Sequence, residues 1–206
     1  FVIPNPFVPT ETRIIDFEER KKTIVSVGRF TEQKGFDILI KAYKEVNTKH
    51  PDYKLLIYGD GPLMEQYKAQ IFELGLEDFV QLPGFCSNVS ETIKDAGIFC
   101  LSSRYEGIPN ALLEAMSLGI PVVATDCSPG GARLLTDGGQ RGLLVPTDDV
   151  DKLAAALCML IDDKELAKDI GKKVQSVRTL FSPANIAVKW KEVFEYCQNS
   201  LIESDK

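Results

Sequence analysis

The stretch "YEGIPNALLEAMSLGIPVVAT", residues 105–125, joins a loop, a helix and a strand in direct succession. Gly107 and Pro109 mark the loop, and "PNALLEAMSLG" then has the apolar spacing of an amphipathic helix. "IPVVAT" is a continuous apolar run, which is typical of a strand that is buried on both faces. Because this strand follows a helix, the stretch indicates a parallel sheet covered by helices.

The same alternation extends in both directions from this stretch. Strands are predicted at residues 23–28, 53–59, 79–84, 98–103, 120–125 and 141–146. Helices are predicted at residues 36–49, 62–75, 86–97, 109–119 and 148–163, with two more after residue 164, the last at 182–198. We therefore expect a Rossmann-like α/β fold with a doubly wound, parallel six-stranded sheet, whose ligand binds at the carboxyl ends of the strands.

Composition argues against several functional classes. The chain has 206 residues, 44% of them hydrophobic, and a net charge of −6 without the clustered Lys and Arg that bind nucleic acid. It has no apolar run of the ~20 residues that span a bilayer and no signal-peptide pattern. Five cysteines without a CxxC pair indicate reduced thiols and a cytoplasmic location. Because the sequence begins at Phe1 rather than Met, we expect it to be part of a longer protein.

Acidic and imidazole side chains do not predict a metal site. The sequence "DVD" at 149–151 opens a helical pattern, so helix capping explains it better than metal binding. Asp137 and Asp148 lack the spacing of metal ligands. His50 follows a helix and is interpreted as a surface residue rather than a catalytic one. We therefore expect no metal.

Cations and glycines gather at the carboxyl ends of the predicted strands. Arg29 and Lys34 follow the first strand, where such side chains suit phosphate oxygens. Two solvated surface cations would give the same pattern. "GDGP" at 59–62 is part of a dinucleotide-binding pattern, but Met64 replaces the third glycine and the motif does not follow the first strand. A nicotinamide cofactor is therefore not expected.

Two carboxylates flank the start of the helix predicted at 109–119. The helix start offers free backbone N–H groups to a diphosphate, and Gly107 lets the backbone approach a ligand closely. Glu106 precedes the helix and Glu114 lies within it, up to ~12 Å away. This separation suits the two hydroxyl-rich ends of one ligand better than a pair that acts on one bond. Apolar neighbours indicate that Glu114 is partly enclosed and needs a partner, although an ordinary helix glutamate is the alternative.

Five segments carry a family resemblance: "VGRFTEQKGFDILIKAY", "LLIYGDGPLMEQY", "VQLPGF", "YEGIPNALLEAMSLGIPVVATD" and "RGLLVPTDD". In this order they resemble the donor-binding half of glycosyltransferase family 4. Members of this family are retaining transferases of the GT-B fold, in which two Rossmann-like domains face each other across a cleft. The Glu-x7-Glu element and the Arg-x4-Lys element are its most specific parts, and the resemblance covers almost the whole chain.

The resemblance implies a role for each candidate residue. The catalytic candidates are Arg29 and Lys34, which would hold the donor diphosphate, and Glu106, which would contact the transferred sugar. Glu114 would bind the ribose hydroxyls. The rest of the donor would be lined by Gly28, Gly59, Gly84, Phe85, Val89, Gly107, Ile108, Pro109, Asn110 and Ala111. The resemblance implies no metal and no cofactor, and a nucleoside-diphosphate sugar as donor, with a UDP-sugar favoured.

The resemblance also implies a domain organisation. Residues 1–20, which include "VIPNPF", would be the interdomain hinge, and residues 21–181 the donor-binding domain. Residues 182–206 would form a C-terminal helix that packs towards a missing N-terminal domain. That domain would bind a saccharide or lipid-linked acceptor and provide any peripheral contact with the membrane. The fragment alone would then bind the donor without transferring its sugar.

Other functions stay open at this point. The family often has an acidic residue shortly after a "GG" loop, whereas "PGGARLLTD" at 129–137 has Arg133 and Leu134, which leaves the donor sugar undefined. A nucleotide-sugar-binding module without transferase activity is one alternative. A GT-B phosphorylase is a second, although no lysine motif for pyridoxal phosphate is visible. An epimerase is a third, and its His-rich chemistry does not fit a chain with one His.

Overall fold

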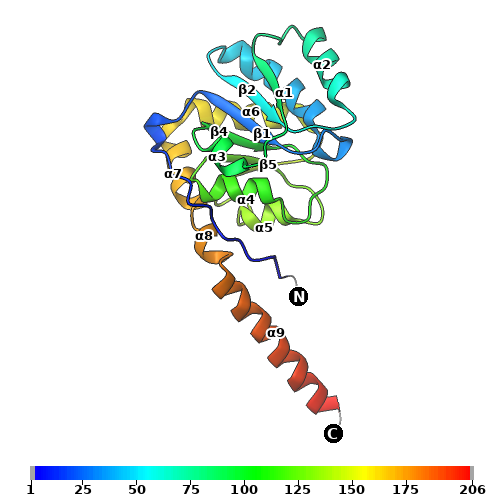
Figure 1. Cartoon of the computed structure of the whole chain (residues 1–206), viewed down its shortest axis with the longest axis vertical. Coiled ribbons are helices and arrows are strands. Elements are labelled where there is room, and N and C mark those ends of the chain that lie inside the picture. The colour runs from blue at the N-terminus through cyan, green and yellow to red at the C-terminus, as the bar shows by residue number, and fades with distance from the viewer. Residues whose placement is uncertain (1–2, 205–206) are drawn as a thin grey trace.

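The computed structural model describes the backbone of residues 3–204 and the side chains of residues 3–198 (Figure 1). Over this part of the chain, six strands form one parallel sheet in the order β3-β2-β1-β4-β5-β6. The strands are β1 (Thr23–Val27), β2 (Lys54–Tyr58), β3 (Val80–Gly84), β4 (Ile98–Leu101), β5 (Val122–Thr125) and β6 (Leu143–Val145). The expected Rossmann-like, doubly wound sheet is confirmed.

Helices cover both faces of this sheet. On one face a central helix contacts two others: α1 (Phe36–Lys49) with α2 (Met64–Glu73) and α6 (Val150–Asp162). On the other face the central helix is α4 (Asn110–Ser117), which contacts α3 (Val89–Ile93), α7 (Lys164–Val174) and α8 (Val177–Leu180). The remaining elements are α5 (Gly131–Leu135), α9 (Pro183–Ser204) and the 3-10 helices η1 (Phe17–Glu19) and η2 (Glu32–Lys34).

Strands β4 and β5 lie at the centre of the core. Every side chain of these two strands is buried, and α4 packs against both. In α1, the buried residues Leu39, Tyr43 and Val46 recur with helical spacing, and each is 0% exposed. The continuous apolar runs in the sequence therefore correspond to strands covered on both faces.

Two predicted helices differ from the structure in their extent, and the short helix α5 was not predicted. The helix predicted at 86–97 is limited to α3, which begins where the Asn88 side chain accepts a hydrogen bond from the Glu91 backbone N–H. Helix α5 was not predicted, because five residues are too few to show a helical period. The last helix extends to Ser204, whereas the sequence predicted an end at residue 198.

Two polar residues noted in the sequence have structural roles. The Asp149 carboxylate accepts a hydrogen bond from the backbone N–H of Lys152 (2.9 Å), so the predicted capping of α6 is confirmed. His50 follows α1, as predicted. Its side chain is only 17% exposed, so His50 is more buried than the predicted surface position. The reason is that α6 packs on α1 and brings the Asp162 carboxylate to 3.4 Å from His50 Nε2.

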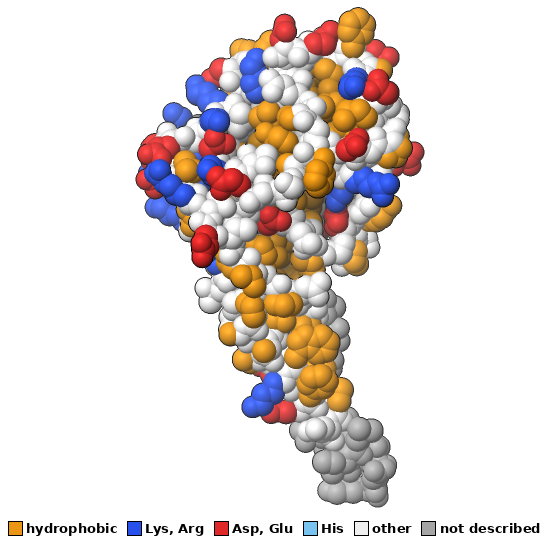
Figure 2. Space-filling view, in the orientation of Figure 1, with side chains coloured by type: hydrophobic (Ala, Val, Ile, Leu, Met, Phe, Trp, Pro, Cys, Tyr) orange, Lys and Arg blue, Asp and Glu red, His pale blue; other side chains and the backbone are white. Residues whose placement is uncertain are grey.

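The segment before β1 is bonded to the sheet domain, whereas helix α9 extends away from it (Figure 1). Before β1, the Arg20 guanidinium donates to the carbonyl oxygens of Ala96 (3.2 Å) and Leu118 (2.7 Å). Helix α9 instead extends away from the sheet (Figure 1) and shows hydrophobic side chains on its visible face (Figure 2); its exposed ones include Val188, Trp190, Phe194 and Tyr196. Residues 1–2 of the expected hinge and 205–206 of the expected C-terminal helix lie outside the described residues.

Within the described residues, every helix is too short or too polar to span a bilayer.

The strand order reverses between β1 and β4. From β1 the chain continues through α1 to β2 on one side, and from β4 it continues through α4 to β5 on the other. In open α/β sheets, ligands bind in the crevice that such a reversal creates outside the carboxyl ends of the strands. The loops after β1 and β4 carry Lys34 and Glu106, so these two residues lie at the strand-order reversal, where such a crevice is expected.

Candidate functional site

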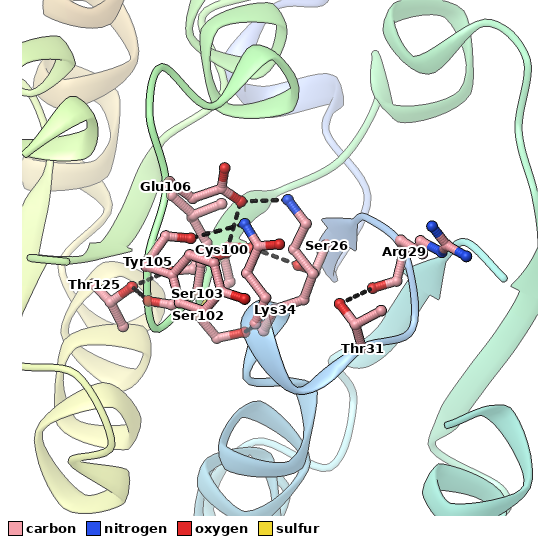
Figure 3. A network of polar contacts seen from close by, with 12 residues as sticks. Ser26, Arg29, Thr31, Lys34, Cys100, Ser102, Ser103, Tyr105, Glu106 and Thr125 are labelled. Carbon is pink, nitrogen blue, oxygen red and sulfur yellow. Dashed lines mark hydrogen bonds and ion pairs between the residues drawn. The ribbon is translucent and has the colours of Figure 1, made fainter. Parts of the chain in front are cut away.

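Lys34 and Glu106 form an ion pair where the strand order reverses (Figure 3). The Lys34 side chain is 20% exposed and that of Glu106 is 10% exposed, so the pair is largely removed from water. A buried carboxylate needs hydrogen-bond or charged partners. Two groups donate to Glu106 Oε1, namely Lys34 Nζ and, at 3.1 Å, Ser103 Oγ.

The two loops that carry this pair are joined along their backbones. Ser102 Oγ donates to the carbonyl oxygen of Lys34 (2.8 Å). The backbone N–H of Arg104 donates to the carbonyl oxygen of Gln33 (2.8 Å), and Gln33 Nε2 donates to that of Tyr105 (2.9 Å). These contacts fix the spacing between the segment that carries Lys34 and the one that carries Glu106.

Arg104 connects these two loops to a third. Its guanidinium donates to both carboxylate oxygens of Asp37 in α1 (3.0 and 2.8 Å) and to the Asp148 carboxylate before α6 (2.7 Å). The hydrogen bonds that Arg104 donates to Asp37, above all, raise the pKa of Arg104 above its ordinary value. Sequence reasoning did not single out Arg104, because a lone loop arginine shows no spacing that points to its partners.

Helix α4 begins next to the ion pair. Pro109 is its N-cap, and no described side chain caps it, so the backbone N–H groups of its first turn are available to a ligand. A Cβ on Gly107 would meet no described atom within 4 Å, so the loop backbone is open on that side. A Cβ on Gly131 would lie 1.5 Å from the Gly107 carbonyl oxygen, which means that α5 packs directly against this loop.

Glu114 lies within α4 and is half-buried. Ser90 of α3 is 0% exposed, and its hydroxyl donates to Glu114 Oε2 at 2.8 Å. Glu114 is thus enclosed and partnered, as expected. The identity of the partner could not be read from the sequence, because only the packing of α3 on α4 brings Ser90 close.

A hollow of about 390 Å³ opens at the carboxyl ends of β1, β2 and β3; its lining consists of Val27, Gly28, Arg29, Gly59, Asp60, Phe85, Cys86 and Val89. Gly59 must be glycine, because its φ is 149° and a Cβ would lie 1.8 Å from the Gly28 carbonyl oxygen. The Phe85 ring is 78% exposed and offers an aromatic surface. Burial raises the pKa of the Cys86 thiol, which does not favour a nucleophilic role.

Apart from Glu114, the predicted site residues fall into two groups in the structure. Five of them line the hollow, with Gly84 at the end of β3 beside it: Gly28, Arg29, Gly59, Phe85 and Val89. Lys34, Glu106 and residues 107–111 lie at the start of α4. Arg29 and Lys34, which the resemblance assigns to one diphosphate, point in different directions (Figure 3), although the Lys34 side chain passes beside Gly28 of the hollow. Arg29 is exposed and points away from Glu106, whereas Lys34 is bonded to it (Figure 3).

Arg133, which departs from the family pattern, has a partner within the chain. Its guanidinium donates to both carboxylate oxygens of Asp126, which follows β5. Among the described residues, no three His, Cys, Asp or Glu side chains are grouped so that they could hold a metal ion.

The family with the description "Glycosyl transferases group 1" matches residues 8–177 of this sequence. The chain belongs to this family of glycosyltransferases, and its sheet is the Rossmann-like sheet of a GT-B enzyme.

Three similar proteins illustrate the relationship. An uncharacterized glycosyltransferase of Haemophilus influenzae is 32% identical over 190 residues, which are 92% of this chain and 53% of that protein. The N-acetylgalactosamine-N,N'-diacetylbacillosaminyl-diphospho-undecaprenol 4-alpha-N-acetylgalactosaminyltransferase of Campylobacter jejuni is 34% identical over 172 residues, 84% of this chain and 46% of that protein. The crystal structure of an S. aureus TarM mutant in complex with Fondaparinux, alpha-GlcNAc-glycerol and UDP has a TM-score of 0.82 and 25% identity, over 94% of this chain and 39% of that chain. The chain thus spans about half the length of the two sequence relatives.

Proposed function

We propose that this chain is the donor-binding, C-terminal half of a retaining transferase of glycosyltransferase family 4. One observation carries the proposal: Lys34 and Glu106 meet at the strand-order reversal, directly before the uncapped start of α4. A cation and free N–H groups suit a diphosphate, and a carboxylate suits sugar hydroxyls. The UDP bound by the TarM mutant supports a UDP-sugar as the donor.

In this proposal the donor extends from the hollow to the ion pair. The nucleoside occupies the hollow, where the exposed ring of Phe85 offers a face to the base. Glu114 accepts hydrogen bonds from the ribose hydroxyls, while Ser90 keeps its carboxylate oriented. Arg29 approaches the diphosphate from the side of the hollow and Lys34 from the crevice, so the two cations act on it from different directions.

The proposed mechanism depends on stabilising the leaving group. As the bond between sugar and diphosphate breaks, negative charge develops on the diphosphate, and Lys34 with the N–H groups of α4 stabilises it. Lys34 Nζ must leave Glu106 Oε1, or bridge the two groups, to reach a phosphate oxygen. An acceptor hydroxyl attacks the anomeric carbon on the face that the diphosphate leaves and passes its proton to the departing diphosphate oxygen, so the configuration is retained without a protein nucleophile or a metal.

The acceptor is proposed to bind a second domain that precedes this chain. The chain spans about half of its relatives, and the exposed Val188, Trp190 and Phe194 of α9 form an apolar surface that such a domain would cover. Residues 1–20 would then be the hinge, 21–181 the donor domain and 182–206 the helix that packs towards its partner. The diphospho-undecaprenol in the name of the Campylobacter relative supports a lipid-linked acceptor, and with it a cytoplasmic site at the membrane surface.

Variants of the two glutamates test this assignment. Glu114→Ala should weaken UDP and UDP-glucose alike, by about tenfold or more, because a hydrogen bond to a charged group contributes about 1.5–3 kcal/mol. Glu106→Gln should weaken UDP-glucose by about tenfold. It should leave UDP unchanged or bound more tightly, because Lys34 is released from the ion pair. Isothermal titration of the 206-residue chain with each ligand measures both effects.

Glu65→Gln serves as the control for these titrations, because the Glu65 side chain on α2 is 83% exposed and lines neither the hollow nor the crevice. Equal losses of UDP affinity in Glu106→Gln and Glu114→Ala would contradict the division of roles. Donor binding by a longer protein that transfers no sugar would favour the alternative of a nucleotide-sugar-binding module.

A further inference from the structure

The Glu106 carboxylate has one anchored oxygen and one open oxygen. Oε1 accepts from Lys34 Nζ, which reaches it from the other loop, and from Ser103 Oγ at 3.1 Å, which belongs to its own loop. Among the described residues, none donates to Oε2. Figure 3 shows that Oε2 points away from both donors. A ligand can therefore bond to Oε2 without displacing either contact at Oε1.

Ser103 is itself held firmly. It is 1% exposed, and its backbone carbonyl accepts a hydrogen bond from Thr125 Oγ1 on β5. The next residue, Arg104, is bonded to Asp37 through both of the Asp37 carboxylate oxygens. The hydroxyl of Ser103 therefore stays beside Glu106, whereas Lys34 is a long and flexible side chain that can move.

We propose that Ser103 is a positioning residue that keeps the Glu106 carboxylate oriented when Lys34 moves to the donor diphosphate. The inference rests on the proposed function. Without Ser103, the departure of Lys34 would leave a buried carboxylate without a partner, which is costly, so Glu106 would turn away from the sugar. With Ser103 in place, Oε1 stays bonded and Oε2 stays directed at a sugar hydroxyl. The effect of Ser103 is therefore specific to a ligand that carries a sugar.

Titrations with UDP and UDP-glucose test the role of Ser103. Ser103→Ala should lower the ratio of UDP-glucose affinity to UDP affinity on the order of tenfold, as expected for a lost hydrogen bond to a charged group. The matched control is Ser26→Ala, because Ser26 is also 1% exposed but donates to the carbonyl oxygen of Cys100 (2.7 Å) instead of to Glu106. Ser26→Ala should leave the ratio unchanged. Each variant is titrated at a temperature at which circular dichroism shows it to be folded.

A double variant shows whether Ser103 acts through Glu106. In a Glu106→Ala background, Ser103→Ala should change the affinity ratio no further, because the group that it positions has been removed. An unchanged ratio in the single variant Ser103→Ala, or additive losses in the double variant, would overturn the inference.

Ligand-free crystal structures separate this inference from the proposed function. In Lys34→Met, which removes the mobile donor, Glu106 Oε1 should stay within hydrogen-bond distance of Ser103 Oγ. In Lys34→Met combined with Ser103→Ala, the carboxylate should turn away from that position. If the wild-type chain binds neither UDP nor UDP-glucose, the proposed function fails, and these structures alone decide the role of Ser103. The same carboxylate orientation in both variants would then overturn it.

Discussion

Lys34→Met should lower the free energy of unfolding of this chain by about 3 kcal/mol, the lower end of the range for breaking a buried ion pair. The lower end applies because the two side chains are 20% and 10% exposed, so water screens the pair in part. Methionine is a long, uncharged replacement that leaves the Glu106 carboxylate buried, with Ser103 as its remaining side-chain donor among the described residues. Urea unfolding followed by circular dichroism measures the change.

Two further variants identify the cause of this loss. Lys34→Met combined with Glu106→Gln removes both charges and should recover most of the lost stability, because no uncompensated charge is left buried. Lys94→Met breaks an exposed pair with Glu91, whose side chains are 35% and 50% exposed, and should cost about 0.5 kcal/mol or less. Equal losses of unfolding free energy in Lys34→Met and Lys94→Met would show that the Lys34–Glu106 pair stabilises the chain no more than an exposed ion pair does.

Gly131→Ala should destabilise the chain by about 3 kcal/mol or more, the upper end of the cost of overpacking. The added Cβ would lie 1.5 Å from the Gly107 carbonyl oxygen and 2.6 Å from the Gly107 carbonyl carbon, so α5 or the loop before α4 must shift. Gly131 is the first residue of α5, and alanine favours a helix more than glycine does. The loss, again measured by urea unfolding, must therefore come from the contact with Gly107.

Gly107→Ala is the reciprocal variant. It adds the same methyl group to the other partner of this contact, where no described atom lies within 4 Å. We expect its stability to stay within about 0.5 kcal/mol of the wild type, as is usual for an open surface position. Its affinity for UDP-glucose should fall, because the methyl group occupies space that the proposed donor needs. A wild-type free energy of unfolding for Gly131→Ala would contradict the close packing of α5 on this loop.

The sheet and most of its helices could be predicted because their signals are local. The apolar runs of β4 and β5 are continuous, and the structure buries every side chain in them. The pattern at 36–49 predicted α1 with the bounds that the structure has, since a glycine precedes it and Pro51 follows. Helix α5 escaped prediction because it is short and begins at a glycine pair.

The site could be predicted only in part, because its contacts join distant segments. The loop and helix that carry Glu106 and Glu114 form one local motif, which the sequence displays directly. The Lys34–Glu106 pair instead depends on β1 and β4 being neighbours, which strand pairing decides. Arg29 and Lys34 are close in sequence, but Lys34 belongs to η2 and its side chain bonds to Glu106, whereas Arg29 lines the hollow.

We expect this chain to bind a nucleoside diphosphate at the start of α4 without a metal. Thermal unfolding of the 206-residue chain with UDP, GDP and ADP, each with and without EDTA, tests it most directly. A ligand that binds the native state raises its stability by mass action. UDP should raise the Tm most, and EDTA should leave the shift unchanged because Lys34, Arg29 and the start of α4 supply the contacts to phosphate. An unchanged Tm with all three nucleotides would contradict the claim.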